Sequence, residues 1–267
     1  MRPIFKSYAS QQTSQQGFSL LELMVGLTIG LFILLGVTNV FMFISSTQRT
    51  LSESTALQQQ GSLIMRIIGY SIRQAGGTYL TSGAGGKFGF DTSYDGYNAT
   101  GFNVQGTEGG ADDPDTLQVS QQNAPLTVIS KTDMDCLGNK STFANRIDNQ
   151  YSLDTKTQSL MCLGSGKTSA QAIAIGVEDF QVRYGIASLG VGNTQELQYF
   201  NADKVPTWAD LRAVEVCIVM NAIDTKNEAA GGSVIKGCDD KTIASDGKIR
   251  KIFTNTFFLR NSHSKEV

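Results

Sequence analysis

Residues 17–44 read GFSLLELMVGLTIGLFILLGVTNVFMFI, and this stretch decides the fold of the first part of the chain. No charged residue occurs from 23 to 48, and residues 23–44 are mostly Leu, Ile, Val, Phe, Met and Gly. At about 1.5 Å per helical residue, the apolar run can cross a hydrocarbon core of roughly 30 Å. The stretch therefore predicts a membrane-spanning helix close to the N-terminus.

Three interpretations of this helix compete. A secretory signal has an apolar region of about 7–15 residues and then a small-x-small cleavage site. The run here is longer, and residues 44–47 offer only a poor site. A plain signal anchor explains the length and the basic residues Arg2 and Lys6 before it. It accommodates Glu22 only if that carboxylate reaches the headgroup region, about 6 Å along the helix from Phe18.

The third interpretation rests on a resemblance. Residues 17–22, Gly-Phe-Ser-Leu-Leu-Glu, with the apolar run after them resemble the class III signal of type IV prepilins and pseudopilins. This resemblance implies that residues 1–17 are a leader peptide, that a prepilin peptidase cuts after Gly17, and that Phe18 is then N-methylated. It also implies that Glu22 pairs with the N-terminal amine of a neighbouring subunit. Both roles are physically reasonable, because glycine lets a protease approach the backbone closely and a carboxylate in a bilayer needs a partner.

Features elsewhere narrow the resemblance to minor pilins. The leader is longer than those common among type IVa pilins, and Asn39 stands where many major pilins carry a helix-kinking proline. Three later segments resemble recurring segments of PilW-type minor pilins and of their relative, the J-type pseudopilin of type II secretion. These segments are residues 115–117, 176–185 and 253–261.

This resemblance implies a structural subunit, not an enzyme, with no cofactor. Such a subunit would prime type IV pilus assembly and sit at or near the pilus tip. Its partners would be other minor pilins, the major pilin, the peptidase, the assembly platform and the inner membrane, with a tip adhesin as a further candidate. The leader would be cytoplasmic and the head periplasmic before the subunit reaches the surface pilus. A minor pseudopilin of type II secretion and an adhesin or DNA-capturing tip subunit are the alternatives.

The helix is predicted to continue beyond the membrane segment as an amphipathic helix. Apolar or small residues recur every three or four positions with Gln, Ser and Arg between them, and Gly76-Gly77 ends the pattern. The recurring residues are Leu57, Gly61, Ile64, Ile68, Ile72 and Ala75. The expected organisation is a leader at 1–17, a membrane or filament-core helix at 18–45, an amphipathic half at 46–80 and a head at 81–267.

The head is predicted to be rich in antiparallel strands. Residues 81–115 read as a long irregular loop with one short strand at 88–90, because Gly, Asp, Ser, Thr and Asn dominate there. Further strands are expected at 116–120, 126–130, 151–153, 159–163, 173–175, 178–186, 213–221 and 249–259. Short connections without helical patterns favour an antiparallel sheet, so the fold class is α+β and type IV pilin-like, with the long helix packed on the sheet.

Composition and motifs point away from catalysis and from nucleic-acid binding. The chain has 22 Lys+Arg against 24 Asp+Glu, and its single histidine, His263, lies near the end. These numbers disfavour a basic nucleic-acid-binding stripe and a His-based catalytic or metal site. Glu178 and Asp179 are neighbours in a strand and would face opposite sides. Asp112, Asp113 and Asp115 lack the spacing of a calcium loop and read as a solvated turn, so no metal site is predicted.

Four cysteines occur, and none forms a C-x-x-C motif. An even number suits disulfides in an oxidising compartment, and four cysteines allow three pairings. We favour Cys136 with Cys162 and Cys217 with Cys238, because each pair closes a local loop. Buried free thiols are the alternative.

Overall fold

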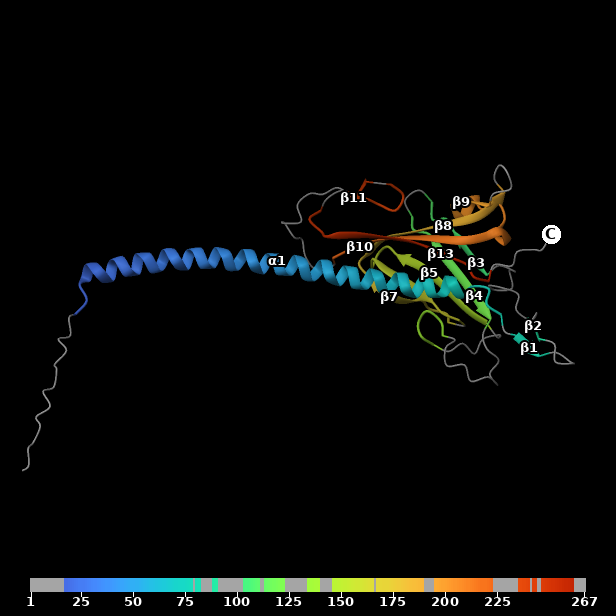
Figure 1. Ribbon diagram of the computed structural model, residues 1–267, viewed down its shortest axis with the longest axis horizontal. Coiled ribbons are helices and arrows are strands. Elements are labelled where there is room, and N and C mark those ends of the chain that lie inside the picture. The colour runs from blue at the N-terminus through green and yellow to red at the C-terminus, as the bar shows by residue number, and fades with distance from the viewer. Residues whose placement is uncertain are drawn as a thin grey trace, which may run out of the picture. The chain divides into compact units, whose positions relative to one another are not determined.

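A computed structural model of the chain contains one long helix and a series of antiparallel strands (Figure 1). The structure describes residues 17–78, 80–82, 88–90, 103–110, 113–122, 134–139, 146–165, 167–189, 195–222, 235–240, 242–243 and 246–261. The chain divides into two compact units, Met1–Arg49 and Thr50–Val267.

Helix α1 (Leu20–Gln74) is continuous, as the absence of an interior proline predicts. It ends where Gly76 adopts a φ of 69°, a left-handed conformation that costs glycine little. The Gly76 N–H donates to the Ser120 carbonyl at 2.9 Å, and the Asn261 amide donates to the Ala75 carbonyl at 3.1 Å. These bonds provide partners for two of the backbone groups just beyond the helix end.

A five-stranded antiparallel sheet forms the first layer of the head. Its strands follow one another in chain order, β3-β4-β5-β6-β7, as a meander. They are β3 (Val104–Thr107), β4 (Thr116–Gln122), β5 (Arg146–Asp154), β6 (Ser159–Leu163) and β7 (Gln171–Ile175).

A second, four-stranded antiparallel sheet has the order β13-β10-β8-β9. It is built from β8 (Val177–Leu189), β9 (Gln195–Phe200), β10 (Leu211–Asn221) and β13 (Arg250–Phe258). Strand β13 therefore forms one edge, and β9 forms the other. Two three-residue 3₁₀-helices, η2 (Ala202–Lys204) and η3 (Trp208–Asp210), lie between β9 and β10.

Two small antiparallel ribbons complete the described strands. One pairs β1 (Leu80–Ser82) with β2 (Phe88–Phe90), and the other pairs β11 (Ile235–Lys236) with β12 (Thr242–Ile243).

The core lies between the second half of α1 and the two sheets. One face of the helix is buried over Leu57, Gly61, Ile64, Met65, Ile68, Gly69, Ser71 and Ile72. Two glycines of this face fit against β13: a Cβ added to Gly61 would overlap the ring of Phe253, and one added to Gly69 would overlap the ring of Phe257. The amphipathic pattern of 46–75 is thus core packing, with glycine chosen where an aromatic ring approaches the helix.

A buried hydrogen-bond network joins the helix to the five-stranded sheet. The hydroxyls of Ser71 and Tyr151 are 2.7 Å apart, and the Asn149 amide donates to the Ser71 hydroxyl at 3.3 Å. Tyr151 is fully buried, and that burial raises its pKa well above the ordinary value. Since a buried hydroxyl without a partner is costly, these contacts stabilise the docked helix.

The strand predictions met mixed outcomes. The predicted helix end and the strands at 88–90, 116–120, 151–153, 159–163, 173–175, 178–186, 213–221 and 249–259 each coincide with an observed element, within a few residues. The predicted strand at 126–130 lies outside the described residues. Reading 81–115 as a loop with one strand was wrong for Val104–Thr107, which pairs with β4.

The β3 strand escaped prediction because its sequence, VQGT, carries a glycine and only one large apolar residue. Tyr184 and Thr116 explain that glycine: a Cβ on Gly106 would overlap the Tyr184 hydroxyl and the Thr116 carbonyl. Glycine in this strand allows the Tyr184 side chain and the Thr116 backbone to approach closely. Sequence patterns alone treat such a glycine as a loop signal.

Candidate assembly site

The proposed processing segment immediately precedes α1. Gly17, Phe18 and Ser19 lie outside the helix, and the Phe18 side chain is 83% exposed. The Ser19 carbonyl accepts the N–H groups of Glu22 and Leu23 at 3.0 and 3.1 Å and so starts the helix. The bond between Gly17 and Phe18 therefore lies in an exposed segment outside regular structure.

Glu22 lies in the first turn of α1 and is exposed. A carboxylate in this position interacts favourably with the partial positive charge at a helix N-terminus. That interaction lowers the cost of an acid next to an apolar run but leaves the carboxylate oxygens accessible. The side chain is therefore available for a cation outside this chain.

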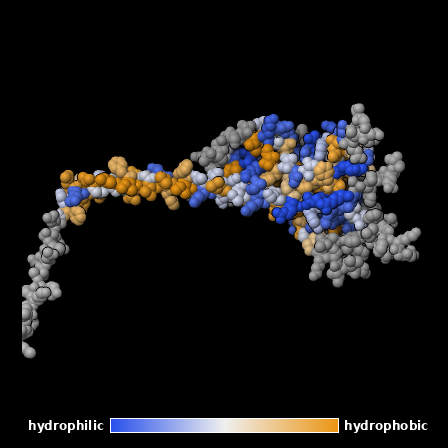
Figure 2. Space-filling model, in the orientation of Figure 1, coloured by the Kyte–Doolittle hydropathy of each residue, from blue (hydrophilic) through white to orange (hydrophobic). Residues whose placement is uncertain are grey.

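The first half of α1 exposes its large apolar side chains on all sides. Figure 2 shows hydrophobic residues along this part of the helix. The exposed residues include Leu20, Leu23, Val25, Leu27, Ile29, Leu31, Phe32, Ile33, Leu34, Val37, Phe41, Phe43 and Ile44. The helix is long and apolar enough to cross a membrane, and the most apolar window of it has no buried residue. A helix that is apolar all round requires lipid or other helices around it.

The few polar side chains in this half bond to their own helix. The hydroxyls of Thr28 and Thr38 donate to the carbonyls of Val25 and Leu34 at 2.9 and 2.6 Å, and the Asn39 amide donates to the Leu35 carbonyl at 3.0 Å. Both hydroxyls and one N–H of the Asn39 amide thus have acceptors within the helix. This arrangement suits a helix inside a bilayer or a filament core.

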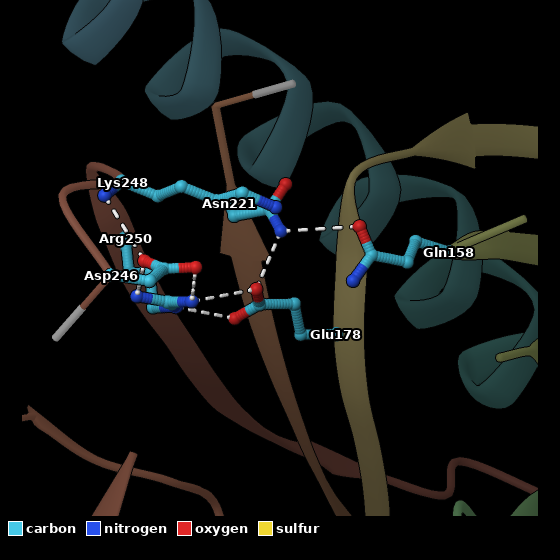
Figure 3. Close-up of polar contacts among 6 residues, drawn as sticks. All are labelled: Gln158, Glu178, Asn221, Asp246, Lys248 and Arg250. Carbon is cyan, nitrogen blue, oxygen red and sulfur yellow. Dashed lines mark hydrogen bonds and ion pairs between the residues drawn. The ribbon is translucent and has the colours of Figure 1, made fainter. Parts of the chain in front are cut away.

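Within the head, a polar cluster closes one end of the four-stranded sheet (Figure 3). The Arg250 guanidinium on β13 makes two bonds to the Glu178 carboxylate, at 2.6 and 3.0 Å, and two to Asp246, at 2.7 and 2.9 Å. The Asn221 amide donates to Glu178 and, at 3.3 Å, to Gln158. Gln158 belongs to the turn between β5 and β6, so the cluster ties both sheets together.

Electrostatics show that this cluster is an ion-pair clamp. The hydrogen bonds that Arg250 donates, first to Glu178 and then to Asp246, raise the pKa of Arg250 above its ordinary value. The Arg250 guanidinium in turn lowers the pKa of Asp246 to about 2. Glu178 and Arg250 have side chains only 14% and 9% exposed. All their charges are compensated within the cluster, as a structural role requires.

The acidic segment before β4 differs from the prediction of a solvated turn. Asp112 lies outside the described residues, but Asp115 is only 2% exposed. Its two carboxylate oxygens accept the N–H groups of Gly109, at 3.0 Å, and Val182, at 2.8 Å. Burial raises the Asp115 pKa to about 6. The carboxylate therefore replaces missing backbone partners between β3, β4 and β8, a role that no local sequence signal reveals.

The cysteines are joined as Cys136–Cys162 and Cys217–Cys238, the pairs favoured from their spacing. The first disulfide links the segment before β5 to β6, and the second fastens the turn after β11 to β10. Within the described part of the chain, His, Cys, Asp and Glu side chains form no group of three that could hold a metal ion. His263 lies outside it.

Comparison with known proteins identifies the family of this chain. The family described as "Type IV Pilus-assembly protein W" matches residues 147–261, and the "Prokaryotic N-terminal methylation motif" matches residues 12–38. The chain belongs to the PilW family. With both matches in one chain, it is a type IV pilus minor pilin that carries an apolar N-terminal anchor helix.

The PilW match covers the head from β5 to β13, and the methylation-motif match includes Gly17, Phe18 and Glu22. Among solved structures, a type IV-like pilin from Thermus thermophilus is similar, with 12% identity and a TM-score of 0.43. That similarity covers 77% of this chain and 97% of the other. No curated protein matches the chain.

Proposed function

We propose that this PilW-family chain is a prepilin that is cut after Gly17, methylated on Phe18, and then primes type IV pilus assembly at or near the tip. The observation that carries the proposal is the start of α1. An exposed Gly17–Phe18 bond precedes a helix whose first turn presents Glu22 and whose next turns are apolar all round. The match to the methylation motif supports the same processing.

Assembly in this proposal proceeds by helix packing and charge pairing. The apolar half of α1 anchors the precursor in the inner membrane, with the leader cytoplasmic and the head periplasmic. Lateral packing against the helices of other minor pilins, and later of the major pilin, buries the exposed apolar side chains on the assembly platform. Glu22 pairs with the methylated amine of a neighbouring subunit, which sets the register between the two helices.

The head contributes rigidity in this proposal, and the chain acts as a structural subunit without a catalytic step of its own. Two disulfides, the Glu178–Arg250 clamp and the buried Ser71–Tyr151 contact hold the sheets against the helix. A head fixed in this way can transmit the position of the helix to neighbouring heads.

Mass spectrometry of the N-terminal peptide, from protein purified out of its native membrane, tests the processing. We expect a peptide that begins at N-methylated Phe18. A peptide that begins at Met1 would show an uncut signal anchor, and one that begins beyond residue 44 would show a secreted protein. Either of these results would overturn the proposal.

The role in assembly is tested separately by deleting the gene. We expect loss of surface pili with protein secretion unchanged. Loss of type II secretion with normal pili would instead identify a minor pseudopilin. If pili still form but no longer attach to surfaces or take up DNA, the chain is an adhesive or DNA-capturing tip subunit and not a priming one.

A further inference from the structure

Strand β13 is an open edge of the four-stranded sheet, since within the described residues it pairs only with β10. The Leu259 N–H donates to the Arg212 carbonyl, and the Ala222 N–H donates to the Ile249 carbonyl, both at 2.9 Å. Between these two bonds the register is unbroken. Hydrogen-bonded pairs alternate along an antiparallel ladder, so every second residue of β13 turns its N–H and C=O away from β10. The residues with outward backbone groups are Ile252, Thr254, Thr256 and Phe258.

Beyond its first two residues, Arg250 and Lys251, this edge has none of the usual protection against strand pairing within the described part of the chain. Residues 252–258 read IFTNTFF and contain no charge and no proline. Ile252 is 41% exposed and Phe258 is 59% exposed. An uncharged stretch of an edge strand with exposed apolar side chains is a ready template for another strand.

A groove of about 490 Å³ lies between the β13 edge and α1. Phe253 and Phe257 line it from the strand, and the helix contributes residues spread over about three turns. Those helix residues are Ser62, Met65, Arg66 and Arg73. The groove therefore combines an aromatic wall, a helix face and two guanidinium groups beside unpaired backbone groups.

The two arginines give the groove a positive charge that no carboxylate of the described residues compensates. Arg66 is exposed, and the Arg73 guanidinium lies 5.8 Å from the centre of the Phe257 ring. Neither forms an ion pair with a carboxylate of the described residues, and none of the residues lining the groove is acidic. The complementary occupant is a chain that carries carboxylates.

We propose that β13 accepts one added strand from a neighbouring pilus subunit, and that acidic side chains of this strand pair with Arg66 and Arg73. The proposal rests on the proposed role in pilus assembly, which supplies the neighbour. Arg66 and Arg73 are about 10 Å apart along the helix axis. Side chains on one face of a strand repeat about every 7 Å, so the occupant should carry its acids two to four residues apart.

Photo-cross-linking of the full chain in piliated cells tests the proposal. A benzophenone amino acid replaces Asn255, which is exposed and lines the groove, and in a matched strain it replaces Glu196 on the opposite edge strand, β9. We expect position 255, and not position 196, to link to another pilus subunit through an extended segment with acids at the stated spacing. A link within the chain, a link to a second copy, a link to a segment without such acids, or no link would overturn the proposal.

Two pairs of variants examine the mechanism of the contact. Thr256→Pro removes an outward N–H while leaving the bonds to β10 intact, and Thr256→Val keeps the N–H with nearly the same shape. We expect the proline variant to reduce the cross-link at least tenfold and the valine variant to leave it unchanged. An undiminished cross-link in Thr256→Pro contradicts strand addition.

Charge reversal provides the second pair and does not depend on whether the proline variant folds. Arg66→Glu should reduce the cross-link about tenfold, whereas Lys156→Glu in the turn between β5 and β6 should leave it unchanged. Equal cross-linking in Arg66→Glu and the unaltered chain overturns the acidic partner. One control separates the two hypotheses: the unaltered chain is returned to the deletion strain, and pilus formation is scored. If pili do not form, the proposed function is contradicted. If pili form but none of the variants changes the cross-link, only the added strand is contradicted.

Discussion

The glycines of α1 lie in two different surroundings. A Cβ added to Gly26, Gly30 or Gly36 would have no described atom within 4 Å, whereas one added to Gly61 or Gly69 would overlap a phenylalanine ring of β13. One regular helix thus has a first half whose apolar surface has no partner in the described chain and a second half whose buried face is already filled. The comparison suggests that substitutions in the first half affect assembly, and that those on the buried face of the second half affect folding.

The largest effect is expected at Glu22. Glu22→Gln keeps the size of the side chain but removes the charge that would bind a neighbour's amine. Charge-assisted hydrogen bonds contribute about 1.5–3 kcal/mol, so surface pili counted by electron microscopy should fall about tenfold or more. Glu22→Asp, which keeps the charge, should retain part of the piliation. Normal piliation of the glutamine variant would contradict an assembly role for the first half of the helix.

Gly69→Leu should unfold the head more easily, because the new side chain would displace the buried Phe257 ring. Overpacking of this kind costs about 3 kcal/mol, which thermal unfolding of the full chain in detergent can measure. Gly30→Leu is the matched control, with the same substitution in the same helix, and should leave the unfolding temperature unchanged. Equal destabilisation by both would break the division of α1 into an assembly half and a folding half.

Stability of the head should depend on pH through Asp115. Its folded pKa of about 6 lies above the ordinary value of 3.8. The folded state therefore binds more protons than the unfolded state between these values, and its stabilisation falls as pH rises from about 4 to 6. The decrease is roughly 2–3 kcal/mol.

Asp115→Asn cannot titrate and isolates this contribution. The variant should be less stable than the parent chain at pH 4, because its NH2 group would face one of the two N–H donors where the protonated carboxyl presents an oxygen, and the difference should shrink towards pH 7. Unfolding temperatures of both chains at several pH values measure it. A difference that stays constant with pH would show that Asp115 does not change its charge over this range.

The smallest effect is expected from Tyr151→Phe, which removes the hydroxyl that contacts Ser71. The loss of one buried hydrogen bond costs about 1–2 kcal/mol of unfolding free energy, and Ser71 retains the Asn149 amide as a partner. Denaturant unfolding should detect this change, whereas piliation should remain normal. A loss of pili with an unchanged unfolding free energy would assign an assembly role to the buried face of the second half of α1 as well.

Some features of the head could be predicted because they depend on neighbours in the sequence. Val214, Val216 and Ile218 alternate with other residues at a period of two, and β10 appears where this alternation predicts it. The placement of Glu178 and Asp179 in one strand was likewise a local inference. Arg250, the partner of Glu178, lies 72 residues away, and no local pattern identifies such a partner.

Asp115 shows the opposite outcome. Its neighbours Asp113 and Pro114 are typical of an exposed turn, yet the carboxylate is buried and accepts the Val182 N–H from β8. Burial of a side chain depends on what packs over it, and the strand that covers Asp115 comes 67 residues later. The prediction failed because a turn signal describes only the backbone of the turn itself.

The sequence by itself determined the apolar anchor, the order Gly17-Phe18 with Glu22 at the start of the helix, and the alternating strands, because hydrophobic periodicity and short motifs act over a few residues. Only the tertiary structure decided that β13 is an edge, that Gly61 and Gly69 receive its phenylalanines, and that Arg66 and Arg73 border an open groove. Strand order and register arise from contacts between distant segments. They depend on the pairing of the whole sheet, which no segment specifies alone.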